Sequence, residues 1–313
     1  MKLLLPDSAP FSLTVPPEVT VVTYEASRPV PPEHLDAEAL VVWGSSRDDI
    51  AAVARRMPQL RWVQTLAAGS ESVLAAGFPD DVVLTSGSGL HDLTVTEHAL
   101  TLVLTLLRRL PAAGRAQAER RWAGELGGVQ ALRPADAVTS LIGARVLVWG
   151  FGNIGQTLAP LLRQLGAEVR GVARTAGQRA GFQVVAEDGL ERELPHTDVL
   201  VMILPSADAT HRALSKRRLD ALPKHAYVVN VGRGTTVNED ALAAALDAGD
   251  IAGAGLDVTA VEPLPDDSPL WNARNLVLTP HAAGGRPVGA DSLISDNVAA
   301  LLAGEPLRNV IKR

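Results

Sequence analysis

Residues 145–155 read RVLVWGFGNIG, so an apolar strand runs directly into a glycine-rich turn. The turn has the spacing G-x-G-x-x-G, and the residues after it continue with the periodicity of a helix. The first glycine permits the tight turn, the second lets a phosphate approach the backbone, and the third allows the helix to pack on the strand. Exposed amides at the start of the helix would bind the pyrophosphate of a dinucleotide. The predicted cofactor-binding residues of the turn are Gly150, Gly152, Asn153, Ile154 and Gly155.

Short apolar runs alternate with helical stretches on both sides of this turn, which predicts parallel sheets with helices on both faces. One series precedes residue 90, and a second starts at residue 144. The predicted strands are residues 3–5, 19–23, 40–43, 62–65 and 82–85, and then 145–149, 168–172, 199–204, 226–231, 253–258 and 277–279. The predicted helices include residues 47–57, 70–76, 154–165, 215–222 and 239–248.

We therefore expect two doubly wound α/β domains, a flavodoxin-like substrate domain and a Rossmann dinucleotide-binding domain. The substrate domain would comprise residues 1–96 and 284–313, because the helical stretch 289–303 has no strand after it and is expected to pack on the first sheet. The dinucleotide-binding domain would comprise residues 97–283 and begin with a long, almost wholly apolar helix over residues 97–110. A helix of that kind is buried on most of its sides.

The composition excludes several classes of protein. The 313 residues include 29 Lys and Arg against 35 Asp and Glu, a net charge of −6, and no densely basic segment that could bind nucleic acid. The absence of cysteine rules out disulfides, a thiolate nucleophile and cysteine-ligated zinc, and no His/Asp cluster has metal-ligand spacing. The N-terminal MKLLLPD reaches an acid and a proline too soon for a signal peptide, and the apolar residues 99–107 are fewer than the roughly 20 that span a bilayer. We expect a cytoplasmic protein without a metal, membrane or nucleic-acid partner.

The end of the second strand after residue 144 bears on the choice of cofactor. This strand ends in Ala173-Arg174-Thr175. In NAD-binding domains an acid about 20 residues after the glycine turn accepts a hydrogen bond from the ribose 2′-hydroxyl. No carboxylate stands here, whereas Arg174 and Thr175 can bind a 2′-phosphate. The sequence therefore favours NADPH, with NADH as the alternative, and Arg179 is the next basic residue to consider.

Three further segments carry reactive side chains near the ends of predicted strands. Arg233 lies in VNVGRGTT, Glu262 in AVEPLP and His281 in LTPHAAGG. The carboxyl ends of parallel strands meet at one edge of a sheet, where ligands bind in folds of this class. The three side chains can therefore converge although they lie far apart in the sequence.

With these motifs the sequence resembles the D-isomer-specific 2-hydroxyacid dehydrogenase family, particularly its glyoxylate/hydroxypyruvate reductase branch. The spacing from Arg233 to Glu262, and from Glu262 to His281, matches that of the family. The resemblance covers nearly the whole chain. It includes LRWVQTLAAG ending at residue 69, TEHALTLVLTLLRRL starting at residue 96, the glycine turn, and SPLWNARNLVLTPH ending at residue 281.

The resemblance implies NAD(P)H-dependent reduction of a small 2-oxo acid to the D-2-hydroxy acid, with Arg233, Glu262 and His281 as catalytic residues. The chemistry of these side chains agrees with such roles. Arg233 can bond the carboxylate and the carbonyl of a 2-oxo acid. His281 can protonate the carbonyl oxygen as it gains charge, because histidine titrates near neutral pH. Glu262 would favour the imidazolium and orient the ring.

The resemblance also implies contacts outside this catalytic set. The backbone at Ala68 and Gly69 would receive the substrate carboxylate. The residues that would border the nicotinamide are Leu204, Val231 and Asp257. The segment around Trp271 would approach the active site of a partner subunit, in a homodimer built on the apolar helix and a following helix that reaches Trp122.

Two departures from the family pattern concern substrate preference. Ser70-Glu71 stands where the family loop usually carries an Asp, and Gly232 stands where Ala is more usual. Neither alters the reaction chemistry.

Two other functions stay open at this point. One is a D-3-phosphoglycerate or D-lactate dehydrogenase of the same family. The phosphoglycerate branch often adds a C-terminal regulatory domain, and this sequence ends soon after its last helix, so we expect that version less. The other is a non-enzymatic corepressor that senses the dinucleotide, since such corepressors keep the same three side chains. Fold alone does not separate these functions.

Overall fold

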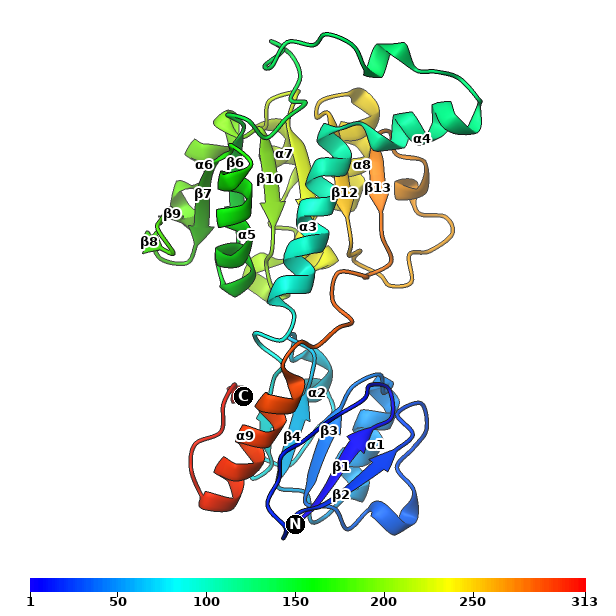
Figure 1. The fold of residues 1–313 in the computed structure, drawn as a ribbon, viewed down its shortest axis with the longest axis vertical. Coiled ribbons are helices and arrows are strands. Elements are labelled where there is room, and N and C mark those ends of the chain that lie inside the picture. The colour runs from blue at the N-terminus through cyan, green and yellow to red at the C-terminus, as the bar shows by residue number, and fades with distance from the viewer. The chain divides into compact units, whose positions relative to one another are not determined.

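A computed structural model describes residues 1–313, which divide into two compact units. Unit 1 comprises Met1–His91 and Gly285–Arg313, and unit 2 comprises Asp92–Gly284. Each unit contains one sheet with helices packed on both of its faces (Figure 1). The prediction of an α/β fold with two doubly wound parallel-sheet domains is confirmed. The units meet at His91/Asp92 and at Gly284/Gly285, and the sequence placed the domain boundaries at 96/97 and 283/284.

Unit 1 has a five-stranded sheet in which every neighbouring pair of strands is parallel. The strand order is β2-β1-β3-β4-β5, which is the flavodoxin-like order. The strands are β1 (Lys2–Pro6), β2 (Thr20–Tyr24), β3 (Ala39–Val42), β4 (Trp62–Thr65) and β5 (Val83–Thr85). The helices are α1 (Arg47–Arg56), α2 (Glu71–Ala75) and α9 (Ala290–Ala303).

The two faces of this sheet have separate cores, because successive side chains of a strand point to opposite faces. Leu4 of β1 packs in the same cluster as Ile50 of α1. Its neighbours Leu3 and Leu5 belong to the opposite cluster, together with Ile294 of α9. The last long helix of the chain therefore covers the sheet that the first strands form, and unit 1 is discontinuous in the sequence.

Unit 2 has an eight-stranded sheet with the order β13-β12-β11-β10-β6-β7-β9-β8. All its pairs are parallel except β8 with β9. The strands are β6 (Arg145–Trp149), β7 (Glu168–Ala173), β8 (Gly177–Arg179), β9 (Phe182–Ala186), β10 (Val199–Met202), β11 (Tyr227–Asn230), β12 (Gly253–Leu256) and β13 (Leu276–Leu278). The sequence predicted only six of these. It missed β8, which has just three residues, mostly exposed, and carries no apolar run, and it also missed the five-residue strand β9, whose sequence is FQVVA.

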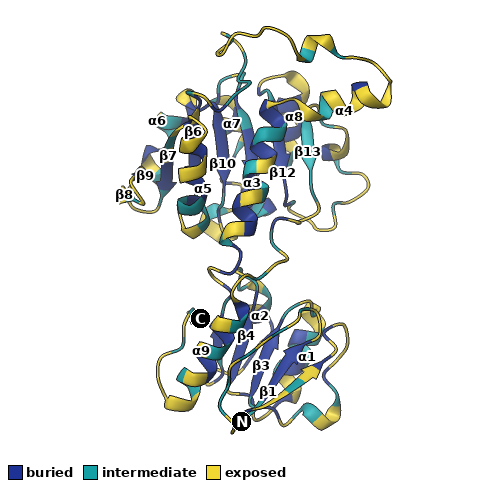
Figure 2. Ribbon diagram, in the orientation of Figure 1, coloured by how far each residue is buried: buried dark blue, intermediate teal, exposed yellow.

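The helices of unit 2 cover both faces of this sheet (Figures 1 and 2). One core cluster contains buried residues of α3 (Asp92–Leu107) and α5 (Asn153–Gln164). The other contains residues of α6 (Leu190–Glu193), α7 (Lys216–Asp220) and α8 (Glu239–Ala248). None of the helices combines the length and the apolar composition needed to cross a bilayer.

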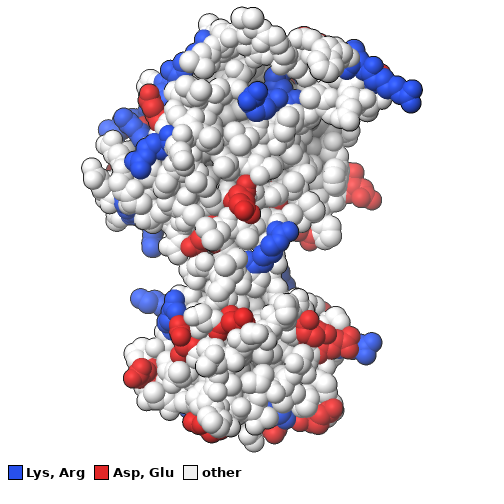
Figure 3. Space-filling view, in the orientation of Figure 1, with Lys and Arg blue, Asp and Glu red and all other residues white.

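The segment after α3 differs from the sequence prediction. The apolar helix begins at Asp92 and ends at Leu107, and its buried side chains pack within unit 2 itself. The next helix, α4 (Leu110–Ala118), ends before Trp122, whose side chain is 96% exposed. On the visible face of unit 2, Lys and Arg side chains occur in small separate groups (Figure 3).

Candidate active site

The glycine turn between β6 and α5 leaves room for a phosphate. Gly150 has φ +100°, and a Cβ there would lie 2.4 Å from the carbonyl oxygen of Ile203, so only glycine fits this turn. At Gly152 a Cβ would meet nothing within 4 Å, so the space beside this backbone is open. Gly152 also caps α5 without a side-chain hydrogen bond, and the first-turn amides stay available to an anion. These features fit the pyrophosphate of a dinucleotide.

The end of β7 lies beside a guanidinium from the hairpin that the sequence did not predict. Arg179 of β8 donates hydrogen bonds to the carbonyl oxygen of Phe151, at 3.3 Å, and to the carbonyl and hydroxyl oxygens of Thr175, at 3.0 and 2.8 Å. It therefore connects the glycine turn to the end of β7. Arg174, which lies between the end of β7 and Thr175 in the sequence, is exposed. Two guanidinium groups and a hydroxyl thus belong to this corner of unit 2, and no carboxylate follows β7 directly.

His281 and Glu262 form a hydrogen-bonded pair beyond the ends of β13 and β12. The Nδ1 atom of His281 lies 2.7 Å from Oε2 of Glu262, and the two side chains are 47% and 39% exposed. The other carboxylate oxygen, Oε1, accepts a hydrogen bond from the amide of Thr259 at 3.1 Å. A carboxylate can only accept, so Nδ1 is the donor and Nε2 is left for a reacting group. This arrangement can orient the ring.

Arg233 follows β11, next to β12 in the same sheet. Its carbonyl oxygen accepts hydrogen bonds from the side chains of Asn230, at 3.0 Å, and Thr236, at 2.6 Å, which hold this backbone in place. A Cβ at Gly232 would lie 2.6 Å from the backbone of Leu204. The glycine at this position therefore allows the loops after β10 and β11 to approach closely, which accounts for the departure from Ala.

Of the three residues predicted to border the nicotinamide, two are buried apolar side chains and one is a buried carboxylate that accepts hydrogen bonds. Leu204 and Val231 follow β10 and β11 and are almost wholly buried. Asp257 follows β12 and is only 1% exposed, and its carboxylate accepts hydrogen bonds from the amides of Ala282 and Ala283. Sequence reasoning did not anticipate that Asp257 binds the turn that carries His281.

The remaining predicted residues do not lie at the carboxyl ends of the strands of unit 2. Ala68 and Gly69 follow β4 in unit 1, in the loop before α2. Ser70 precedes α2 and makes no side-chain capping bond. Trp271 is 53% exposed, and its indole nitrogen donates to the carbonyl oxygen of Pro265 at 2.8 Å.

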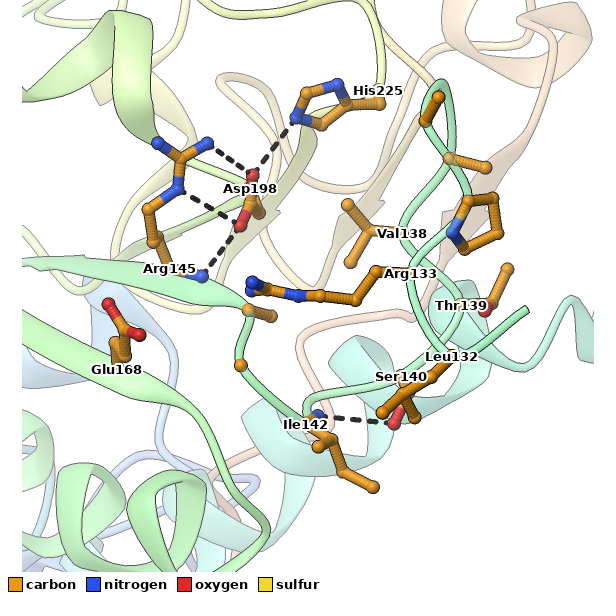
Figure 4. Close-up of a pocket in the computed structure, with 15 residues that line it drawn as sticks. Leu132, Arg133, Val138, Thr139, Ser140, Ile142, Arg145, Glu168, Asp198 and His225 are labelled. Atoms are coloured by element: carbon orange, nitrogen blue, oxygen red, sulfur yellow. Dashed lines mark hydrogen bonds and ion pairs between the residues drawn. The ribbon is translucent and has the colours of Figure 1, made fainter.

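A cavity of unit 2 lies at the opposite edge of the sheet, where the strands begin (Figure 4). Its volume is about 340 Å³, and it is lined by residues 132–135, 137–140 and 142–145 and by side chains next to the starts of strands. Asp198 accepts hydrogen bonds there from the backbone and side chain of Arg145 and from His225, at 2.7 to 3.3 Å. Burial would raise the pKa of Asp198, but these hydrogen bonds outweigh it and hold the pKa below its usual value. No group of His, Cys, Asp or Glu side chains in the structure is arranged to hold a metal ion.

Comparisons with known proteins agree with this geometry. The sequence profile of the family described as "D-isomer specific 2-hydroxyacid dehydrogenase, NAD binding domain" matches residues 100–283. An uncharacterized protein in the proB 3′ region of Corynebacterium melassecola is 31% identical over 253 residues, which are 80% of this chain and 78% of that protein. Glyoxylate/hydroxypyruvate reductase A of Salmonella choleraesuis is 38% identical over 168 residues, which are 53% of this chain and 54% of that protein. The match thus spans about half the length of that reductase.

A solved structure is similar over nearly the whole chain. It is a D-isomer specific 2-hydroxyacid dehydrogenase from Xanthobacter autotrophicus Py2 in complex with NADPH and MES. The TM-score is 0.78 at 33% identity, and the match covers 95% of this chain and 90% of that one.

Proposed function

This chain belongs to the D-isomer specific 2-hydroxyacid dehydrogenase family, whose members are NAD(P)-dependent oxidoreductases, and we propose that it reduces a small 2-oxo acid with NADPH. Glyoxylate and hydroxypyruvate are the proposed substrates, with the D-2-hydroxy acid as product. The similarity to a glyoxylate/hydroxypyruvate reductase supports this choice. The observation that carries the proposal is the 2.7 Å pair of His281 and Glu262 at the carboxyl edge of a dinucleotide-binding sheet.

The residues at this edge fit a bound nicotinamide dinucleotide. The open backbone at Gly152 and the uncapped first turn of α5 would hold the pyrophosphate. When bound, the reduced nicotinamide supplies a hydride to the carbonyl carbon of the 2-oxo acid. Leu204 and Val231 follow the neighbouring strands β10 and β11 at the same edge and would form an apolar border beside the ring.

The chain's own residues then orient the acid and move a proton. Arg233 bonds the carboxylate and the carbonyl oxygen of the substrate, which fixes the carbonyl carbon for attack. Glu262 accepts the hydrogen bond from Nδ1 of His281 and holds the orientation of the ring. The Nε2 proton of His281 passes to the carbonyl oxygen as negative charge builds there. We assign Ala68 and Gly69 to the substrate carboxylate through their backbone amides.

The proposed preference for NADPH rests on the corner at the end of β7. Arg174 is exposed and makes no hydrogen bond or ion pair, so its guanidinium is available to a 2′-phosphate. Arg179 already donates to Thr175 and adds a second positive charge beside it. NADH lacks the 2′-phosphate and gains nothing from either charge.

A panel of 2-oxo acids, assayed with NADPH and NADH at the nicotinamide absorbance, tests this function. We expect the highest kcat/KM for glyoxylate or hydroxypyruvate with NADPH. A preference for pyruvate would indicate a D-lactate dehydrogenase, and a preference for 3-phosphohydroxypyruvate would indicate a D-3-phosphoglycerate dehydrogenase. Tight binding of NADPH without oxidation by any acid in the panel would contradict an enzymatic role and favour the dinucleotide-sensing corepressor.

A further inference from the structure

A chain of hydrogen bonds links helix α3 to the turn that carries His281. Nε2 of His98, on α3, lies 2.8 Å from the hydroxyl oxygen of Thr279, which follows β13. The Thr279 hydroxyl donates to Oδ1 of Asp257 at 2.7 Å. Nε2 of His98 also lies 3.2 Å from the same carboxylate oxygen. His98 and Asp257 belong to elements about 160 residues apart in sequence, and all three residues lie within unit 2.

The protons available on these groups decide which atom donates in each of these hydrogen bonds. An ionised carboxylate only accepts hydrogen bonds, and a hydroxyl group has a single proton to donate. The Thr279 proton is given to Asp257, so the 2.8 Å contact requires a proton on Nε2 of His98. The structure therefore assigns the Nε2–H form to His98, with its proton directed at Thr279 and Asp257.

Asp257, at the other end of this series of hydrogen bonds, holds the backbone of the His281 turn. The amide of His281 donates to the carbonyl oxygen of Asp257 at 2.8 Å. The next two amides, of Ala282 and Ala283, donate to its carboxylate oxygens at 2.8 and 3.0 Å. His281 itself has φ +51°, a left-handed conformation that a non-glycine residue keeps only where its surroundings hold it. Three successive amides on one aspartate provide that restraint.

We propose that His98 and Thr279 are positioning residues for the proton donor. They fix the orientation of the buried Asp257 carboxylate, which in turn fixes the turn and the ring position of His281. Neither side chain contacts substrate or cofactor in this role. The proposal rests on the proposed function, because His281 has to donate a proton for its position to affect turnover.

The sharpest variant is Thr279→Val, which removes the hydroxyl and keeps the shape of the side chain. We expect kcat to fall by about 10-fold to 100-fold, because small displacements of a catalytic group cost that much. KM for the 2-oxo acid and Kd for NADPH should change less than about two-fold, since ground-state contacts are intact. Thr279→Ser restores the hydroxyl and should recover kcat to within about three-fold of the wild type.

Thr197→Val is the matched control at the other end of the same sheet. It removes a hydroxyl that is 3% exposed and donates to the carbonyl oxygen of Glu193 at 2.9 Å. We expect normal kcat with a lowered Tm. A loss of kcat in Thr197→Val equal to that in Thr279→Val would overturn the positioning role, as would a Thr279→Ser enzyme as slow as Thr279→Val.

Imidazole ¹H–¹⁵N NMR of the protein without cofactor gives a readout that does not depend on turnover. The seven histidines can be assigned by single replacements. His98 should show a protonated, slowly exchanging Nε2, and Thr279→Val should abolish that protection and shift the ring signals of His281. An unprotonated Nε2 on His98, or unshifted His281 signals in Thr279→Val, would overturn the inference. If the wild type shows these signals but reduces no 2-oxo acid, the proposed function is wrong, and so is the effect of His98 and Thr279 on turnover. The hydrogen bonds among His98, Thr279 and Asp257 would still be supported.

Discussion

At each end of the strands of the eight-stranded sheet an acidic side chain is hydrogen-bonded to a histidine, but the acid is partly exposed at one end and buried at the other. At the carboxyl edge, His281 and Glu262 are paired, yet 47% and 39% of their side chains are exposed. At the amino edge, Asp198 is 7% exposed, and Arg145 and His225 bond its carboxylate. The amino edge has the cavity beside Arg145 and His225, but the carboxyl edge has the polar atoms that a ligand can still reach.

Polar groups that a ligand can still reach, and not a cavity, are therefore the reason to place the proposed active site at the carboxyl edge. A carboxylate whose oxygens are occupied by protein donors stabilises the fold, while a half-exposed histidine with one nitrogen oriented can exchange a proton. The segment that lines the amino-edge cavity exposes the apolar side chains of Leu132 and Ile142, and exposed apolar groups of this kind are typical of surfaces that bind another chain. Each prediction below tests this division between the two edges.

Replacing the proposed proton donor should have the largest effect. We expect His281→Ala to lower kcat by about 10²-fold to 10⁴-fold, the usual contribution of a positioned acid, with little change in NADPH affinity. Steady-state kinetics and a fluorescence titration of NADPH measure both quantities. The control is His196→Ala, an exposed histidine before β10 at the amino edge, which should behave as the wild type. Near-normal turnover of His281→Ala would remove this residue from the mechanism.

Replacing the buried acid of the amino edge should affect stability and leave turnover intact. We expect Asp198→Asn to lower the free energy of unfolding by about 2–3 kcal/mol, less than for a wholly buried pair because Arg145 is partly exposed. Urea unfolding measures this change. Asp220→Asn breaks an exposed pair with Lys216 and should cost under about 0.5 kcal/mol.

The pH dependence of that stability has a definite sign. The pKa of Asp198 is held below its usual value in the folded state, so the stability it contributes is present above the ordinary carboxyl range. It is lost as the pH falls through the lowered pKa. The difference in unfolding free energy between wild type and Asp198→Asn should therefore shrink on acidification. A difference that grows at low pH would contradict the role of the Arg145 and His225 hydrogen bonds.

The cofactor preference should change by a smaller factor. A charged hydrogen bond to the 2′-phosphate contributes about 1.5–3 kcal/mol, which is roughly tenfold to 150-fold in kcat/KM for NADPH over NADH. Ala173→Asp together with Arg174→Ala should reverse the preference, because the carboxylate repels the phosphate and accepts from the free hydroxyl. The ratio should be measured at low and moderate salt, since screening weakens the phosphate contact.

Two results would contradict this assignment. One is equal use of NADH and NADPH by the wild type, and the other is an unchanged ratio in the double variant. If only the second occurs, Arg179→Ala identifies whether the hairpin guanidinium carries the preference.

Disrupting the predicted homodimer should have the smallest effect on turnover. We predict a homodimer through the segment after α3, where the exposed fractions are 53% for Leu110, 96% for Trp122, 107% for Val129 and 60% for Leu132. Sedimentation at micromolar concentration should give twice the 32.9 kDa chain mass. Trp122→Ser together with Val129→Ser should shift the protein toward monomer. A wild-type monomer would contradict the prediction.

The sequence by itself determined the fold class, most strands and the glycine turn. These features depend on local rules: apolar runs of strand length, helical periodicity, and glycine where φ is positive, as at Gly150. The same rules identified Arg233, Glu262 and His281 as candidates, because each stands near the end of a predicted strand. The end of α4 and the strand β8 were missed, since neither has a strong local pattern, and β9 was missed although its sequence FQVVA is mostly apolar.

Only the tertiary structure decided which distant residues meet. The sheet order places β12 between β11 and β13, so Asp257 reaches the His281 turn, and α3 packs against the same strands and brings His98 to Thr279. The approach of the loops after β10 and β11 likewise explains Gly232. None of these contacts has a local signal, because hydrogen bonds between residues far apart in the chain depend on strand order and helix packing, which the folded core selects as a whole.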